Sequence, residues 1–503
     1  MVKETELLLK PKPKKNKFQF LNSNYFRPMY NPDFKKLYGD KLCDFITIIY
    51  RDEETDEKKL KIIPNPEFQF FVANDDVKID HHLSQIELSK VHIEAVPYKF
   101  LLEELCNIQD EWEGTKTDFT KYYRDGKKQK GTLYEANKFH KFNRIFSSDI
   151  NIEDYYKGRF LDTYPEASNS KLTKAYTDIE VDSIDISGFP NEDDALCPIN
   201  AITCFINENN TFYTLLLRNE KNPQIQKLEK DIPNFIKELK DFLGSEYEFK
   251  IKFFDDEKKM ILYYFSLNNK FKPDFNLIWN MGFDIPYMLN RIGALSGWDR
   301  NDRERNHKYE FMQTCGELCS SKDFPDYLKV ARYRKDRQNT KASEKIDTFT
   351  ISSYTQWLDQ LSLYASIRKG MGELESLSLS YVAGLELNDD KLNYTDSGSN
   401  IKTLPYDDYR KFVKYNIKDV YLLHKLEEKN NDVGLLNSIA EVTKTRLNKA
   451  MRKTVSLKNM AHHFYIDQGY VQGNNDNLTF HDGDEDELEN GDLEKFAGQL
   501  ASA

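Results

Sequence analysis

The chain has 503 residues and a formal net charge of −11, with 39% hydrophobic residues and six cysteines. This length is enough for about three globular domains of about 150 residues each. Cys315 and Cys319 have no second pair to complete a zinc site, so we expect free thiols in a reducing compartment. No apolar run is long enough to span a membrane, and the amino terminus lacks the order of a signal peptide. These features exclude a small disulfide scaffold and predict a cytoplasmic protein without membrane contact.

The first predicted elements are two strands. The segments 41–50, KLCDFITIIY, and 68–73, FQFFVA, are rich in aromatic and β-branched residues, which is typical of strands. A basic, proline-bearing tail precedes them, to about residue 20. The sequence to about residue 173 therefore predicts mixed α and β structure, and the function of this region is the hardest to predict.

The segment KAYTDIEV, at 174–181, contains two acidic residues in an extended pattern. Side chains of a strand alternate between its two faces. Asp178 and Glu180 therefore share a face with Tyr176, and Ile179 lies on the other. We expect this strand to present acids on one face and to pack on the other.

The next predicted elements are a hairpin, a strand and a helix. Residues 199–217 form two apolar runs that turn at 208–210, and residues 248–254, EFKIKFF, form another strand. Residues 255–270 have apolar side chains at helical spacing. The residues expected to pack on that helix are Met260, Tyr263, Tyr264 and Leu267.

A third acid follows an apolar run. FNLIWN ends at Asn280, and Asp284 comes just before IPYMLNRI. This order places Asp284 at a strand-to-helix turn, where a carboxylate can face a cavity. A plain helix cap is the alternative, because Asp is favoured at the start of helices.

A long amphipathic helix is predicted at 407–429, and it holds Tyr415 and Asp419. Four residues are about one helical turn, so the phenol and the carboxylate project from the same side. On an isolated helix, such a pair is usually surface decoration. Its occurrence after the two earlier acidic segments, each on the expected type of element, favours a shared site.

Four acids on these elements have the chemistry of a metal site: Asp178, Glu180, Asp284 and Asp419. Mg²⁺ and Mn²⁺ prefer hard oxygen ligands. Two such ions about 4 Å apart can activate a water and stabilise the leaving oxygen in phosphodiester hydrolysis. Carboxylates that converge without a cation would raise one another's pKa and destabilise the fold. The sequence therefore predicts bound divalent ions.

These segments, in this order, resemble the Exo I, Exo II and Exo III motifs of proofreading exonucleases of the DEDDy class, with Tyr415 deciding the subclass. NRIFSSDINIEDYYKGRFLDTY before the first motif, IWNMGFDIPYMLNR at the second and ELESLSLSYVAGLEL before the third are similar to family B DNA polymerases of the phage type. The resemblance implies an α/β (α+β) fold with a ribonuclease-H-like exonuclease domain. The domains it implies are a basic tail at 1–20, an amino-terminal polymerase domain at 21–173, the exonuclease domain at 174–429, and at 430–503 a linker toward a palm domain with an acidic flexible tail.

The resemblance also implies a role for each site residue. Asp178 would bridge two ions, Mg²⁺ or Mn²⁺, and Glu180 and Asp419 would complete the tighter one. Asp284 would hold the second ion, partly through water. Tyr415 would orient the attacking water.

DNA contacts are expected at two places. By the resemblance, Asn280 lies near the substrate strand, and Phe283 lies beside it or in the core. The negative net charge does not exclude DNA, because phosphate contacts depend on local Lys and Arg. In family B enzymes a β-hairpin that helps part primer from template lies near the basic stretch at 329–345, so we predict a hairpin or loop touching DNA there, with a plain solvated loop as the alternative. Its expected DNA-binding residues are Lys329, Arg332, Tyr333, Arg334, Lys335 and Arg337.

The motifs of the family's palm domain, which resemble DFxSLYPS, KxxxNSxYG and YGDTDS, do not occur in this sequence. We therefore expect a 3′–5′ exonuclease that acts in DNA replication on single-stranded 3′ ends and primer-template DNA, without polymerase activity of its own. A palm-bearing second polypeptide and a sliding clamp are the expected partners.

A natural half of a split polymerase and a truncated product both explain the ending. Residues 451–471 could bind such a partner or form a terminal helix packed on their own domain. The alternative function is a non-catalytic subunit for DNA binding and assembly.

Overall fold

The computed structural model divides into two compact units. The first comprises Met1–Lys10, Asn65–Tyr155 and Lys458–Ala503, and the second comprises Pro11–Pro64 and Tyr156–Leu457. The structure describes residues 10–26, 43–75, 85–114, 123–124, 127–128, 144–168, 171–220, 222–297, 318–319, 322–336, 341–372, 374–393 and 400–473. The fold is of the mixed α/β class, as predicted. The domain limits expected from the sequence stay a prediction, and the compact units follow a different division, because the strands before residue 65 belong to the same unit as the acidic motifs.

The first unit contains a small antiparallel sheet with strand order β6-β4-β9. Its central strand, β4 (Glu67–Ala73), corresponds to the predicted strand at 68–73. The short strands β5 (Gln85–Glu87) and β18 (Tyr470–Gln472) pair with each other, and Ile466 and Val471 are buried in this unit's core. These contacts favour the terminal-element alternative for 451–471, and partner binding there stays a prediction. The other elements with residues in this unit are β6 (Val91–Pro97), α2 (Leu101–Glu113), β7 (Tyr123–Arg124), β8 (Lys127–Lys128), β9 (Ile145–Phe146), α4 (Ile152–Thr163) and α16 (Lys453–Asp467).

The second unit is built on a six-stranded sheet with strand order β13-β12-β11-β10-β14-β17. The strands β10, β14 and β17 run parallel to one another, and β11 runs antiparallel to its neighbours β10 and β12. The predicted hairpin at 199–217 is confirmed as β11 and β12, with the turn at Asn207–Asn209 and Asn210 in the left-handed region. The strands are β10 (Lys174–Val181), β11 (Ile199–Ile206), β12 (Thr211–Leu217), β13 (Glu248–Phe254), β14 (Phe275–Ile278) and β17 (Gln356–Asp359).

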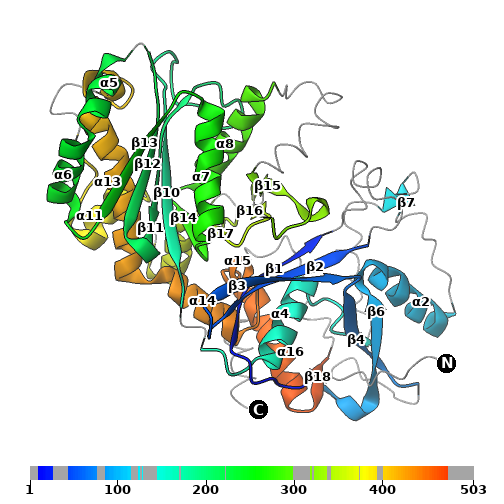
Figure 1. Cartoon of the computed structure of the whole chain (residues 1–503). Coiled ribbons are helices and arrows are strands. Elements are labelled where there is room, and N and C mark those ends of the chain that lie inside the picture. The colour runs from blue at the N-terminus through cyan, green and yellow to red at the C-terminus, as the bar shows by residue number, and fades with distance from the viewer. Residues whose placement is uncertain are drawn as a thin grey trace. The chain divides into compact units, whose positions relative to one another are not determined.

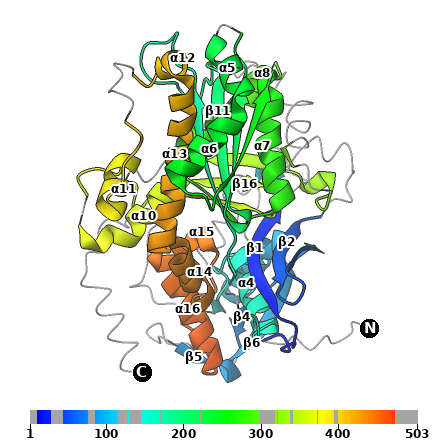
Figure 2. The same ribbon diagram turned by 60° about the vertical axis from the view of Figure 1, so that its left-hand side comes forward.

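Helices cover both faces of this sheet. Figure 1 shows α6 (Ile232–Leu243) and α13 (Tyr409–Asn430) on one side and α7 (Glu257–Phe271) and α8 (Met281–Leu295) on the other. In Figure 2, α13 runs along the sheet beside β11, which it contacts. Met260, Tyr264 and Leu267 are buried on α7 and Tyr263 packs beside them, as the sequence predicts. The remaining helices of this unit are α5 (Pro223–Lys230), α10 (Gln360–Arg368), α11 (Leu379–Leu387), α12 (Leu404–Asp407), α14 (Asp432–Val442) and α15 (Leu447–Ala450).

The face under α13 has an aromatic core that includes a histidine. The ring of His424, on α13, lies 5.4 Å from the ring of Tyr176 and 4.6 Å from that of Phe205. Burial lowers the pKa of His424 to about 4, although the charge of Glu428 acts in the opposite direction. The imidazole is therefore neutral and serves as part of the apolar core.

A three-stranded antiparallel sheet, with strand order β1-β2-β3, completes the second unit. It consists of β1 (Phe18–Phe26), β2 (Phe45–Asp52) and β3 (Glu57–Pro64). The predicted strand at 41–50 is confirmed as β2. The strand β1 begins at Phe18, inside the expected basic tail.

Candidate active site

The first two acids lie on β10, in the middle of the large sheet. Tyr176 is in the core under α13, whereas Ile179 is in the core under α7 and α8. Asp178 and Glu180 share the face of Tyr176 and are half-buried. The alternation of the strand is as predicted, but the face that carries the acids also packs, because Tyr176 is buried in the core under α13.

The third acid is held by the backbone of β10. The strand β14 pairs with β10 only as far as Ile278, and beyond it Asn280 adopts a φ of 66° as the chain turns into α8. Asn tolerates this left-handed conformation better than most residues. The Ile179 N–H, further along β10, donates to Oδ1 of Asp284 at 3.3 Å. Beyond the end of β14, the carboxylate of Asp284 thus accepts a hydrogen bond from the main chain of β10.

The fourth acid comes from α13. Oxygen atoms of Asp178, Glu180 and Asp419 lie within 4.8 Å of one another and could hold a metal ion. Asp284 is buried on α8 and contacts the strand between Asp178 and Glu180. The structure therefore brings the predicted acids together from three separate elements.

Two further residues contact this cluster, and neither was predicted from the sequence. Lys391 donates to Oδ2 of Asp419 at 2.6 Å and to the hydroxyl of Tyr415 at 3.1 Å. Asn416 donates to Oδ2 of Asp178 at 2.8 Å. Asn416 lies three residues before Asp419 on the same helix, which is a spacing that could have identified it. Lys391 follows α11 in an irregular segment, so no periodicity indicates it.

The electrostatics of the acids are those of a site built for cations. Burial raises the pKa of Asp178 to about 7, and the charge of Asp419 adds to the effect. Burial and neighbouring acids also raise the pKa values of Glu180 and Asp284 well above their usual range. The Oδ1 atom of Asp419 is buried and has no hydrogen-bond partner among the described residues. A divalent ion would relieve the repulsion and supply that missing partner, so the residues fit one.

Tyr415 is next to these acids. Burial and the charge of Asp419 raise the pKa of its hydroxyl. The phenol therefore stays protonated at neutral pH and can donate a hydrogen bond. Its neighbour on the helix, Asn416, donates a hydrogen bond to Asp178. One turn of α13 therefore interacts with two of the four acids, Asp178 through Asn416 and Asp419 through Tyr415.

Asn280 and Phe283 lie at the start of α8. Asn280 occupies the position before the first turn, but its side chain makes no capping hydrogen bond and is exposed. A plain cap is therefore not its role. Phe283 is half-buried, packs at the edge of the core under α7 and α8, and contacts the ring of Tyr287 at 5.3 Å. DNA contact by either residue stays a prediction.

The basic stretch forms a β-hairpin, as predicted. The strands β15 (Ala331–Arg334) and β16 (Thr348–Ile351) pair antiparallel. Arg332 and Arg334 are exposed on β15, while Tyr333 between them turns inward and donates to Asp347 at 2.5 Å. A Cβ on Gly282 of α8 would lie 3.0 Å from the same carboxylate, so the hairpin contacts the helix that carries Asp284.

Three other residues of the predicted DNA-binding set have different surroundings. Lys329 pairs with Asp326 at 2.8 Å, and Lys335 pairs with Glu192. Arg337 lies outside the described residues. The two exposed arginines of β15 are thus the clearest candidates for phosphate contacts in the described part of the hairpin.

In the part of the chain that the structure describes, no helix is long and apolar enough to cross a membrane.

Comparison with known proteins shows what the part of the chain that carries three of the four acids is similar to. Residues 109–321 match the family model described as the exonuclease domain of DNA polymerase family B. That range includes Asp178, Glu180 and Asp284, and ends before the hairpin and α13. The expected resemblance is confirmed: this part of the chain is similar to the exonuclease region of family B DNA polymerases of the phage type.

Two relatives are polymerases of bacterial viruses. The chain is 27% identical over 293 residues to the DNA-directed DNA polymerase of Escherichia phage RB69, covering 57% of this chain and 29% of that protein. It is 24% identical over 301 residues to the DNA-directed DNA polymerase of Enterobacteria phage T4, covering 59% and 30%. The chain thus matches less than a third of the length of these relatives.

Proposed function

We propose that this chain is a 3′–5′ exonuclease that removes 3′-terminal nucleotides from DNA by two-metal hydrolysis. The observation that carries the proposal is the convergence of Asp178, Glu180 and Asp419, with Asp284 held beside them by the Ile179 amide. DNA is the proposed substrate because the relatives are DNA-directed DNA polymerases.

Two divalent ions, Mg²⁺ or Mn²⁺, would supply an activated water and stabilise the leaving oxygen. Asp178, Glu180 and Asp419 would hold one ion, and Asp284 with Asp178 would hold the other. The acids offer only oxygen atoms, which suits these hard cations.

The remaining residues of the site would orient the acids and the attacking water. Asn416 fixes the orientation of the Asp178 carboxylate. The Tyr415 hydroxyl, which stays protonated, would orient an attacking water. Lys391 contacts both Tyr415 and Asp419. The exposed Arg332 and Arg334 would bind the phosphates of duplex DNA beside the site.

The test is the degradation of a 5′-labelled single-stranded DNA by the purified chain with Mg²⁺. We expect a ladder that shortens from the 3′ end, and its loss in the Asp178→Ala, Glu180→Ala double variant. A matched control is Asp231→Ala, Glu238→Ala, which removes two acids that pair with Arg410 away from the cluster. Cleavage that persists in the first variant, or starts at the 5′ end, would contradict the proposal.

Association with a palm-bearing polypeptide and a sliding clamp, and the lack of polymerase activity in this chain, also remain proposals. The two partners are supported by the resemblance to phage polymerases alone, and the lack of polymerase activity is supported by the palm motifs that do not occur in this sequence.

A further inference from the structure

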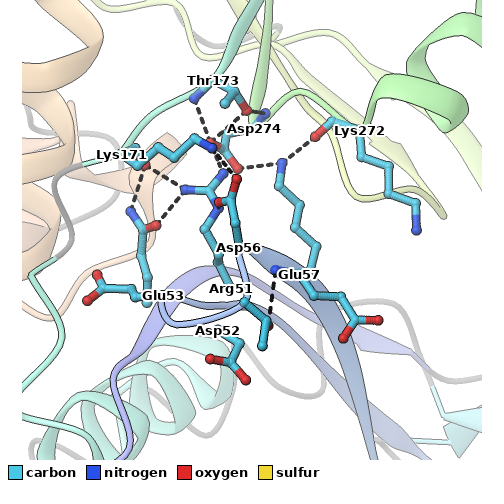
Figure 3. Close-up of polar contacts among 12 residues, drawn as sticks. Arg51, Asp52, Glu53, Asp56, Glu57, Lys171, Thr173, Lys272 and Asp274 are labelled. Atoms are coloured by element: carbon cyan, nitrogen blue, oxygen red, sulfur yellow. Dashed lines mark hydrogen bonds and ion pairs between the residues drawn. The ribbon is translucent and has the colours of Figure 1, made fainter. Parts of the chain in front are cut away.

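Asp274 is a fully buried carboxylate that lies immediately before β14 and contacts two cations of the small sheet. Nη2 of Arg51, on β2, lies 2.6 Å from its Oδ2, and Nζ of Lys58, on β3, lies 2.6 Å from its Oδ1. The side chains of Asp274 and Arg51 are 0% and 2% exposed. Burial alone would raise the pKa of Asp274, but the charges of Lys58 and Arg51 outweigh it and lower that pKa. Figure 3 shows Arg51 pointing at Asp274.

The same carboxylate fixes where the central strands begin. Oδ2 of Asp274 accepts from the Thr173 N–H at 2.7 Å and from the Thr173 hydroxyl at 2.9 Å. In return the Asp274 N–H donates to the Thr173 carbonyl at 2.8 Å. The Asp274 carbonyl accepts from the Gln356 N–H at 2.9 Å. Thr173 precedes β10 and Gln356 begins β17, so the first residues of three parallel strands meet at Asp274.

The small sheet makes two further contacts with these strand starts. Nη1 of Arg51 donates to the Lys171 carbonyl at 2.7 Å and to Oε1 of Gln19 at 2.6 Å. The side chain of Gln356 donates to the Leu21 carbonyl at 2.8 Å. The planar guanidinium of Arg51 thus joins β1, the segment before β10 and the segment before β14 in one fork.

Toward its other end β10 carries Asp178 and Glu180, and β14 leads into α8, which carries Asp284. The pairing of β10 with β14 runs from Lys174 to Thr177 without a shift, so the alignment set at Asp274 is passed along the ladder. Asp178 follows directly, about 16 Å from Thr173 at the usual rise of a strand. At the end of β17, Oδ1 of Asp359 accepts from the Asn280 N–H at 3.3 Å, next to the turn into α8.

We propose that Arg51 is a positioning residue of the exonuclease site, acting through Asp274 on the alignment of β10, which carries Asp178 and Glu180, with β14, which leads to Asp284. The inference rests on the proposed function of the acid cluster as a site for divalent ions. By it, the small sheet β1–β3 helps to set metal affinity and the rate of cleavage.

Lysine at this position keeps the positive charge but cannot reproduce the fork. Its single ammonium cannot hold the Lys171 carbonyl, Gln19 and Asp274 in one plane. Arg51→Lys therefore tests the hydrogen-bonding geometry of Arg51 while keeping its positive charge. The matched control is Arg218→Lys, because Arg218 bridges Glu229 and Asp255 in the same unit and contacts none of the strands that carry the acids.

The experiment measures Mn²⁺ binding by isothermal titration calorimetry, and kcat and KM for cleavage of single-stranded DNA, at a temperature where circular dichroism shows each variant folded. For Arg51→Lys we expect Mn²⁺ binding about tenfold weaker and kcat about tenfold lower, with KM unchanged, because small misplacements of ligands cost this much. Arg218→Lys should match the wild type in all three.

Unchanged Mn²⁺ affinity and kcat in folded Arg51→Lys would overturn the proposal, as would an equal loss in Arg218→Lys. If Arg51→Lys fails to fold, Asp274→Asn decides, because it keeps the size of the side chain while removing the charge through which Arg51 acts; unchanged Mn²⁺ affinity in folded Asp274→Asn would also overturn the proposal. Weaker Mn²⁺ binding in the variant, with no cleavage by the wild type, would support the positioning role and refute the nuclease function. A wild-type chain that binds no Mn²⁺ would overturn both.

Discussion

Replacing Asp178 by Asn should have opposite effects on stability with and without a divalent ion. Oxygen atoms of Asp178, Glu180 and Asp419 lie within 4.8 Å of one another. Without an ion, these charges repel one another. With an ion, the same charges bind it, and removing one weakens the site.

The structure sets the size of both effects. Two unit charges 4.8 Å apart repel by about 3 kcal/mol at an effective dielectric constant of about 20. Asp178→Asn removes two such repulsions, of which the raised pKa values of Asp178 and Glu180 and the ammonium of Lys391 already relieve a part. We therefore expect the metal-free variant to unfold with a free energy about 2–3 kcal/mol higher than the wild type. Mn²⁺ at a hundred times its Kd should stabilise the wild type by about 2.7 kcal/mol, and the variant by much less.

The assay is urea unfolding followed by tryptophan fluorescence, with EDTA and with Mn²⁺. The control is Asp231→Asn, whose carboxylate lies outside the cluster and pairs with Arg410, so Mn²⁺ should stabilise it as it does the wild type. A metal-free Asp178→Asn variant that is less stable than the wild type would refute the repulsion argument. Equal stabilisation of variant and wild type by Mn²⁺ would refute the assignment of Asp178 as a ligand.

Two further predictions concern the core and the hairpin. The pKa of His424 is about 4 in the fold, against 6.5 for an ordinary histidine. As pH falls from about 6.5 to 4, the unfolded chain therefore takes up a proton at this position that the fold does not, and the fold loses stability. His424→Phe should therefore lose about 3 kcal/mol less in urea unfolding between pH 7.5 and 4 than the wild type, and an identical pH dependence would contradict this. The double variant Arg332→Ala, Arg334→Ala should slow degradation of duplex DNA more than of single-stranded DNA, with Lys250→Ala, Lys252→Ala on β13 as the control. Equal losses on both substrates would count against strand separation.

The sequence predicted the parts of the site whose residues follow the regular spacing of a strand or a helix. Alternation along β10 separates Asp178 and Glu180 from Ile179, and a single helical turn joins Tyr415 to Asp419, so the local pattern was sufficient for both. The turn at Asn280 was predicted from the end of an apolar run. The hairpin at β15 and β16 was predicted from family resemblance and charge, and the inward turn of Tyr333 toward Asp347 had no signal in either.

The contacts that the sequence did not predict are long-range. Lys391 reaches Asp419 from an irregular segment, and Arg51 reaches Asp274 from 223 residues away. Neither position has a local pattern that distinguishes it from an exposed basic residue. Only the packing of the small sheet against the strand starts makes Arg51 a buried cation with a defined partner.

The hydrogen bond from the Ile179 amide to Asp284 has a consequence for sequence variation. Its donor belongs to the main chain, which every amino acid except proline provides. Position 179 can therefore exchange one apolar side chain for another of similar volume while Asp284 keeps its support. Among related chains, residue 179 should accept other apolar side chains but not proline, although it stands between two residues that the proposed function requires to be acids.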